Sequence, residues 1–151
     1  MAEDPTSLGQ PPQINQINPL EGSEKVSRFI TASKWVRLDQ TIKSDAFLPA
    51  PLADVSVTRN RNLSSTQLWQ IGQDIANGRK PTPAKLYGRA EITVEKVRKQ
   101  KLDVEAKPTP ENINHAEISG WPRDKPAQKQ VAQRLALQSI FTPRPGRLLG
   151  S

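Results

Sequence analysis

Two short stretches of alternating apolar and polar residues constrain the fold of this chain more than any other feature. They cover residues 86–94 and residues 115–122. In the first stretch Ala90 falls on one side of an extended chain and Arg89 on the other. A period of two is typical of strands that bury one face. We therefore expect two central strands that pair with each other, with the remaining segments as their connections and cover.

Three further segments show the same alternation over shorter lengths. They cover residues 26–30, 54–59 and 102–106. In the first of them Val26, Arg28 and Ile30 would share one face of a strand. Prolines and asparagines are frequent in the intervening segments and are typical of turns. The pattern predicts three additional strands.

A different periodicity marks residues 65–77. Leu68, Ile71 and Ile75 recur at intervals of three and four residues, which places them on one side of a helix. Gly78 suits the left-handed position that often follows a helix. We predict a helix over residues 65–77.

A second helix is predicted over residues 125–140. Asp124 is suited to cap its start, and Pro126 is tolerated in its first turn. For the helix over residues 65–77, either Ser64 or Ser65 is suited to the same capping role.

The order strand, strand, helix, strand, strand, strand, helix is typical of α+β proteins. We expect a single α+β domain over residues 24–141, with a mainly antiparallel sheet and two principal helices on one face. The proline-rich composition of residues 1–23 predicts a disordered arm, and residues 142–151 form a tail. In an alternative arrangement, the arm lies on the domain through three aliphatic side chains: Ile14, Ile17 and Leu20.

Composition narrows the function classes. The chain of 151 residues has a formal net charge of +7 and contains no cysteine. The lack of cysteine excludes disulfide frameworks, thiolate metal sites and cysteine nucleophiles. The positive charge attracts polyanions at long range. Neither a secretory signal nor a membrane-spanning run is recognisable, so we expect a cytoplasmic protein that does not enter a membrane.

No motif for a cofactor or a metal is present. One histidine and scattered carboxylates give no ligand spacing. Gly88, Gly120 and Gly146 stand alone and do not form a phosphate-binding loop. Helix-turn-helix, zinc-finger and RNA-recognition signatures are also absent from the sequence. We therefore expect neither a cofactor nor a metal.

His115 and Arg89 are the sharpest catalytic candidates. Histidine is the side chain whose ordinary pKa lies near neutrality, and a guanidinium clamps phosphate or carboxylate groups. The two residues would act together if their strands face a common cleft. Tyr87 would then lie beside Arg89, and Glu117 would share the face of His115. In the structural alternative, His115 bonds the preceding loop and Arg89 forms a surface ion pair with Glu91.

Basic residues gather in four segments: 59–61, 79–85, 96–101 and 123–129. Phosphate contacts require such groups on one face of the molecule. The most concentrated segment gives four candidates for nucleic-acid binding: Lys96, Arg98, Lys99 and Lys101. In the alternative, these residues are solvated surface charges or meet an acidic protein.

Five pieces of the chain form a pattern that spans most of the predicted domain. They are Val-Ser-Arg-Phe-Ile at 26–30, Ala-Phe-Leu-Pro at 46–49, Val-Ser-Val at 55–57, Leu-Tyr-Gly-Arg-Ala at 86–90 and His-Ala-Glu-Ile-Ser-Gly-Trp-Pro at 115–122. This pattern resembles an uncharacterised family of small bacterial proteins. The resemblance implies a compact bacterial domain and no particular activity.

These observations favour a non-enzymatic binding or adaptor module, whose basic face meets an acidic protein or nucleic acid. The alternative is a small toxin-like enzyme that acts on RNA or a nucleotide through His115 and Arg89. The two hypotheses differ in whether these two side chains converge on one concave site.

Overall fold

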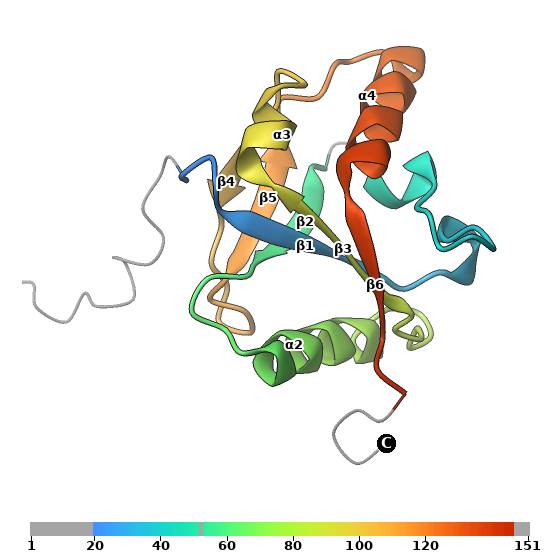
Figure 1. The fold of residues 1–151 in the computed structure, drawn as a ribbon, viewed down its shortest axis with the longest axis vertical. Coiled ribbons are helices and arrows are strands. Elements are labelled where there is room, and N and C mark those ends of the chain that lie inside the picture. Colours follow the sequence, from blue (N-terminus) through green and yellow to red (C-terminus); the bar gives the residue numbers. More distant parts are fainter. Residues whose placement is uncertain (1–19, 52, 147–151) are drawn as a thin grey trace, which may run out of the picture.

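A six-stranded antiparallel sheet forms the centre of the protein (Figure 1). The computed structural model describes residues 20–51 and 53–146. The strands are β1 (Lys25–Ile30), β2 (Val55–Arg59), β3 (Gly88–Thr93), β4 (Asp103–Ala106), β5 (His115–Ser119) and β6 (Ile140–Pro143). The helices are α2 (Ser65–Asn77), α3 (Val94–Arg98) and α4 (Lys125–Gln138), with short 3-10 turns η1 (Ser33–Trp35) and η2 (Ser44–Phe47). The predicted α+β class, antiparallel sheet and two principal helices are confirmed.

The strands follow the order β4-β5-β2-β1-β3-β6 across the sheet. The two expected central strands, β3 and β5, are both present, but β2 and β1 lie between them. β1 pairs with β3 over its full length, from Lys25 opposite Thr93 to Ile30 opposite Gly88. The prediction that β3 and β5 pair directly is wrong, because alternation identifies a strand but says nothing of its neighbour.

The two principal helices cover opposite faces of the sheet, as Figure 1 shows. Ile30 of β1 belongs to the hydrophobic cluster that contains Leu135 of α4. Phe29, the preceding residue, belongs to the cluster that contains Trp69 of α2. The prediction that both helices lie on one face is wrong. Because β1 is buried on both sides, each face of the sheet needs a helix to cover it. We call the two sides the α4 face and the α2 face.

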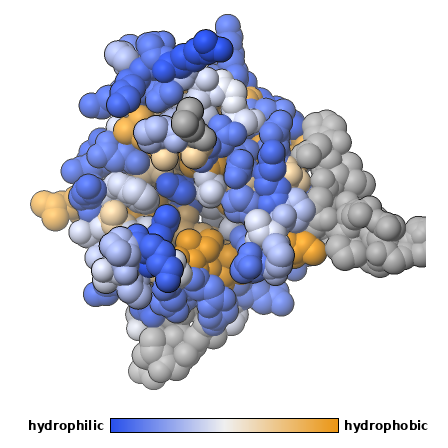
Figure 2. All heavy atoms as spheres, turned by 180° about the vertical axis from the view of Figure 1, so that it is seen from behind, coloured by the Kyte–Doolittle hydropathy of each residue, from blue (hydrophilic) through white to orange (hydrophobic). Residues whose placement is uncertain are grey.

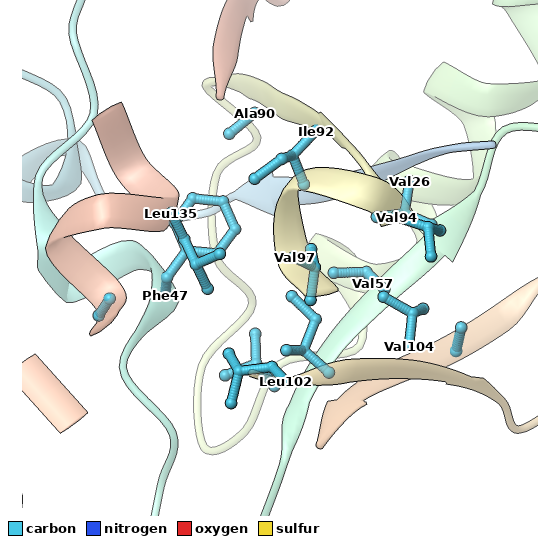
Figure 3. Packing of buried hydrophobic residues seen from close by; sticks show 14 of the residues in the cluster. Val26, Phe47, Val57, Ala90, Ile92, Val94, Val97, Leu102, Val104 and Leu135 are labelled. Carbon is cyan, nitrogen blue, oxygen red and sulfur yellow. The ribbon is translucent and has the colours of Figure 1, made fainter. Parts of the chain in front are cut away.

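The larger hydrophobic cluster lies on the α4 face (Figure 3). Leu135 of α4, Phe47 of η2 and Val97 of α3 are completely buried in it. Complete burial of one such side chain is worth about 1.5–3 kcal/mol. The α4 face therefore supplies most of the hydrophobic stabilisation.

Capping residues set the starts of both helices. The Ser64 hydroxyl accepts the Gln67 N–H at 3.1 Å, and the Gln67 side chain accepts the Ser64 N–H at 2.8 Å. This reciprocal capping box satisfies two N–H groups that a helix start leaves free. Asp124 accepts the Ala127 N–H at 3.0 Å. The predicted caps and the predicted bounds 65–77 are confirmed.

Two predictions about the helix ends are wrong. Gly78 has a φ of −86° and is not left-handed. α4 ends at Gln138 instead of residue 140, because Ile140 begins β6 and pairs with Glu91 of β3. In the sequence, the apolar residues up to position 140 continue the helical pattern. In the structure, the chain leaves the helix after Gln138 and pairs with the edge of β3.

The described domain extends beyond residues 24–141 at both ends. Leu20 packs in the main cluster with 2% of its surface exposed. At the other end, β6 continues to Pro143. Residues 1–19 of the predicted arm, which include Ile14 and Ile17, lie outside the described residues, as do residues 147–151.

Within the described residues, no helix combines the length and the apolar character needed to cross a membrane.

Candidate functional site

β1 and β2 separate after two residue pairs, and this opening organises the candidate site. Val26 pairs with Arg59 and Ser27 with Thr58, and the pairing of these two strands stops there. Arg28, the next residue of β1, extends its side chain into the opening. Its Nη1 donates to the Ser56 carbonyl at 3.0 Å. A side chain thus bonds β2 where the backbone ladder has ended.

Arg28 is held by two carbonyls and an aromatic ring. Its Nε donates to the Ala46 carbonyl in η2 at 2.8 Å. Its guanidinium carbon lies 5.3 Å from the centroid of the Trp35 ring. Among the described residues, no carboxylate forms an ion pair with it. Its positive charge is therefore positioned by the fold without being neutralised.

Arg28 lines a cavity of about 390 Å³ between the sheet and the C-terminal end of α2. The sheet contributes polar side chains from β2 and β5, and the helix end contributes two charged ones. These lining residues are Ser56, Thr58, His115, Asp74 and Arg79. A cavity of this size accepts a small ligand or one group of a larger one. We call it the Arg28 cavity.

The charge balance of the Arg28 cavity is positive. Burial, and after it the charge of Arg79, lower the pKa of Arg28 from its ordinary value to about 10. The guanidinium stays charged at neutral pH, but in a place where a positive charge is disfavoured. Asp74 is the single carboxylate among the described lining residues, and it already accepts a hydrogen bond from Gln70 at 2.9 Å. An anion would supply the opposite charge that Arg28 lacks.

The end of α2 explains the position of Arg79. A helix C-terminus carries partial negative charge and favours a cation beside it. The last carbonyls of α2 are already bonded, since the Gly78 N–H reaches the carbonyls of Asp74 and Ile75, at 3.0 and 3.2 Å. The exposed Arg79 side chain is therefore left available at the rim of the cavity.

His115 lines the Arg28 cavity from the first position of β5. Its Nδ1 lies 2.7 Å from the Lys107 carbonyl. Because a carbonyl only accepts, Nδ1 must carry a proton, and Nε2 of the neutral ring is then an acceptor. The bond to the preceding loop predicted by the structural alternative is present. It also leaves one ring nitrogen for a ligand or a proton.

The structure does not bring Arg89 to His115. Both residues lie on the α2 face, but β2 and β1 separate their strands. The Arg89 guanidinium lies over the Trp69 ring at 4.9 Å, and its Nη2 is 3.8 Å from the Glu91 carboxylate. Its Nε and Nη1 are buried without a hydrogen-bond partner. Arg28 and Arg79, and not Arg89, share a cavity with His115.

Tyr87 and Glu117 also lie outside the lining of the Arg28 cavity. Tyr87 precedes β3 and packs beside the main cluster, whereas Leu86 packs in the α2 cluster. The alternation predicted from residue 86 therefore begins only with β3 at Gly88. Glu117 is half-buried in β5, opposite Ser56 of β2.

The four basic candidates near α3 have different environments. Arg98 donates to the Asp103 carboxylate at 3.0 Å and to the Leu20 carbonyl. It ties down the start of the described chain, so its replacement would disturb the fold. Lys99 and Lys101 are exposed and Lys96 is half-buried. Nucleic-acid binding by this segment stays a prediction, and the three lysines are the ones that can be tested for it.

The face seen in Figure 2 is mostly hydrophilic, and hydrophobic side chains gather near its centre around a hollow. Over the described residues, the large hydrophobic side chains that are exposed come from separate segments: Leu38, Ile113, Leu137 and Ile140. Scattered exposure of this kind is normal for a protein surface. Within the same residues, no group of three or more potential ligands is arranged to hold a metal ion.

Sequence reasoning missed Arg28 and Arg79 as site residues. Arg28 stands between Val26 and Ile30 on a face that is otherwise aliphatic, and a charge within an apolar row was the available signal. Arg79 stands out in the sequence only as one member of a basic segment. Its place in the lining of a cavity shared with His115 of β5 depends on segments far apart in the chain.

Comparison with known proteins adds no assignment: no protein-family model matches the chain, and neither a curated protein nor a solved structure does. The resemblance to an uncharacterised bacterial family therefore stays a prediction.

Proposed function

We propose that the protein is a binding module that holds a phosphate-bearing ligand in the Arg28 cavity. The observation that supports this proposal is the pair of guanidinium groups, Arg28 and Arg79, that line one cavity without an ion-pair partner among the described residues. Guanidinium groups bind phosphate through two parallel hydrogen bonds. Two cations and a histidine match the double charge of a phosphate better than the single charge of a carboxylate.

The lining residues have distinct roles in this proposal. Arg28 is fixed before binding by the Ala46 and Ser56 carbonyls, which lowers the ordering cost of binding. Arg79 is exposed at the rim and closes on the ligand. His115 offers Nε2, and Asp74 offers a carboxylate to a hydroxyl or amino group next to the phosphate. A nucleotide has such groups, and it belongs to the acidic partners expected from the net charge.

Arg79 gives the cleanest test, because its side chain is exposed and its removal takes away no packing. Lys80 is the matched control: it is adjacent, exposed and positively charged, but it does not line the cavity. Calorimetry with inorganic phosphate, pyrophosphate and nucleoside phosphates would compare Arg79→Gln with Lys80→Gln. A charge-assisted hydrogen bond is worth about 1.5–3 kcal/mol. We expect Arg79→Gln to weaken binding about tenfold or more, and Lys80→Gln by less than about threefold.

Two results would overturn the binding proposal. One is that the unaltered protein binds none of these phosphates at about 50 mM salt, where electrostatic attraction is strong. The other is an equal loss in both variants, which would show that net charge alone attracts the ligand.

One observation favours an enzyme as the second candidate. The Nδ1 proton of His115 is engaged by the Lys107 carbonyl, so Nε2 of the neutral ring can act as a base, and His115 belongs to the lining of the cavity. In this version Nε2 of His115 faces the ligand, and His115 acts with Arg28 and Arg79 on a phosphate ester of RNA or a nucleotide. Replacement of a general base typically costs about 10²–10⁴ in rate. His115→Gln should abolish turnover while phosphate binding changes by only a few fold. A wild type without turnover on these substrates removes the enzyme candidate and leaves the binding proposal in place.

A further inference from the structure

A second concave site lies away from the Arg28 cavity and shares no lining residue with it. It is an open groove of about 850 Å³ between the segment that follows η2 and the start of α4. Its walls are mainly apolar and include Leu48, Pro49, Trp121 and Pro122. We call it the Trp121 groove.

The walls of the Trp121 groove are held in place before any partner arrives. The indole Nε1 of Trp121 donates to the Ile118 carbonyl at 2.9 Å, so the polar edge of the ring is already bonded. Gln128 of α4 donates to the Pro122 carbonyl at 2.7 Å. The half-buried ring of Trp121 therefore offers a fixed apolar surface to an incoming side chain.

The rim of the Trp121 groove is basic. Arg123, Lys125 and Lys129 line it and are exposed, whereas Asp54 is the single acid among its described lining residues. Within the described chain, none of the three cations forms an ion pair. Asp124, which lies among them in sequence, caps α4 through the Ala127 N–H. The charge that would complement this rim is therefore negative.

Three prolines in the lining, Pro49, Pro51 and Pro122, restrict how a partner can be held. Proline has no backbone N–H, so these positions cannot donate to an added strand. At these three positions a partner is recognised through side-chain packing and not through backbone N–H groups. A nucleic acid would fit less well, because one tryptophan is a small stacking platform and most of the wall is aliphatic.

We propose that the Trp121 groove binds an acidic peptide segment that inserts one apolar side chain against Trp121. The apolar anchor packs between the ring and the prolines, and flanking Asp or Glu residues meet Arg123, Lys125 and Lys129. Interfaces of this kind concentrate their affinity in one buried anchor and use surrounding charges for orientation and association rate.

A probe set separates the anchor from the charge. The probes are short fluorescent peptides of Glu and Asp with a central Leu-Phe pair, the same peptide with Ala-Ala at the centre, and a Lys-rich peptide with Leu-Phe. A short single-stranded DNA is the fourth probe. Fluorescence anisotropy with the full chain would follow binding at about 50 mM salt. We expect the acidic, anchored peptide to bind at least about tenfold more tightly than each of the other three.

A pair of charge-reversal variants locates the contact. Lys125→Glu with Lys129→Glu should weaken binding of the acidic, anchored peptide by at least about tenfold. Lys80→Glu with Lys85→Glu makes the same change of charge at exposed residues outside the groove, and we expect less than about a threefold effect. Trp121→Phe, which keeps an aromatic ring and is milder than truncation, should also weaken binding, and circular dichroism checks that it folds.

Three outcomes would overturn this inference. They are no binding of the acidic, anchored peptide, equal binding of the Ala-Ala peptide, and tighter binding of the DNA. Equal losses in the two charge-reversal variants would overturn it as well. Arg79→Gln leaves this groove intact, so failure here and failure of phosphate binding at the Arg28 cavity are separate results.

Discussion

The two faces of the sheet bury different kinds of groups. On the α4 face, α4, α3 and η2 close over rows of aliphatic side chains from the strands. On the α2 face, a smaller apolar cluster lies beside buried polar groups. Asn112 donates to the Thr58 hydroxyl at 3.0 Å there, and Ser27 donates to the Asn60 side chain at 2.8 Å.

This difference places most of the hydrophobic stabilisation on one face and the Arg28 cavity on the other. Hydrophobic burial has no preferred direction and grows with the area covered, so a closed aliphatic face gives stability. Hydrogen-bonding groups need specific geometry, and a face built from them is closed less completely. The Arg28 cavity opens on the α2 face, where β1 and β2 have separated. Three substitutions test the comparison, and a fourth tests a loop outside both faces.

The largest effect is expected on the α4 face. Leu135→Ala should lower the free energy of unfolding by about 2–5 kcal/mol, because Leu135 is completely buried and its removal leaves a cavity. Urea denaturation measures this change. Leu137→Ala is the matched control on the same helix; that side chain is 76% exposed, and we expect a change within about 0.5 kcal/mol. Equal losses would mean that α4 does not pack as described.

The next effect is expected where α2 approaches the sheet most closely. A Cβ atom at Gly72 would lie 2.5 Å from both Cδ1 and Cε1 of the Phe29 ring. Overpacking costs about 1–3 kcal/mol, against a gain in helix propensity of up to about 1 kcal/mol. Gly72→Ala should therefore lower the midpoint of thermal unfolding. Gly78→Ala, with its nearest neighbour at 3.4 Å and a negative φ, should not. A stabilised Gly72→Ala would show that the α2 face has free space.

A similar or smaller effect tests the buried polar groups of the α2 face. Thr58→Val keeps the shape of the side chain but removes the acceptor of the Asn112 amide. An unsatisfied buried amide costs about 1–3 kcal/mol. Thr58→Ser, which retains the hydroxyl, should recover part of this loss in the same denaturation experiment. If Thr58→Val is as stable as the wild type, the polar interior of this face does not contribute to stability.

The smallest effect concerns a loop that belongs to neither face. The Thr41 hydroxyl donates to the Asp39 carboxylate at 2.6 Å and the Thr41 N–H at 3.1 Å, and these bonds hold the pKa of Asp39 below its usual range. A carboxyl with a lowered folded pKa adds stability above its ordinary pKa of about 3.9. That stability is lost as the pH falls through the lowered value. Thr41→Val should raise the pKa of Asp39 in an NMR titration. An unchanged pKa would show that the loop is not ordered by this contact.

The sequence predicts those features of the fold that depend on interactions between residues close together in the chain. Ser64 and Gln67 form their capping box within one turn, and α2 has the predicted bounds for that reason. The alternation over residues 115–119 likewise identifies β5. Strand order, the opposite faces of the two helices, and the pairing of β6 with β3 depend on segments far apart in the chain, and alternation contains no record of them.

The candidate site divides in the same way. His115 was singled out because of its residue type, and the structure places it in the lining of a cavity. Its expected companion Arg89 is held by Trp69 and Glu91 instead. Arg28 and Arg79 join His115 through the divergence of β1 from β2 and through the end point of α2. Neither of these features has a local signature.

The double attachment of Arg28 bears on how related chains should be interpreted. Its side chain donates hydrogen bonds to the backbone of two other segments, at Ala46 and Ser56. A related protein that no longer bound the proposed ligand would therefore still need an arginine at this position to fold. Conservation of Arg28 among related proteins would then be evidence for its role in folding and not for ligand binding. The Arg79 side chain makes no such hydrogen bond among the described residues. Under the proposed function, position 79 would therefore vary among related proteins that do not bind the ligand. Under the proposed function, relatives that keep Arg28 but vary at position 79 should no longer bind the ligand in this cavity.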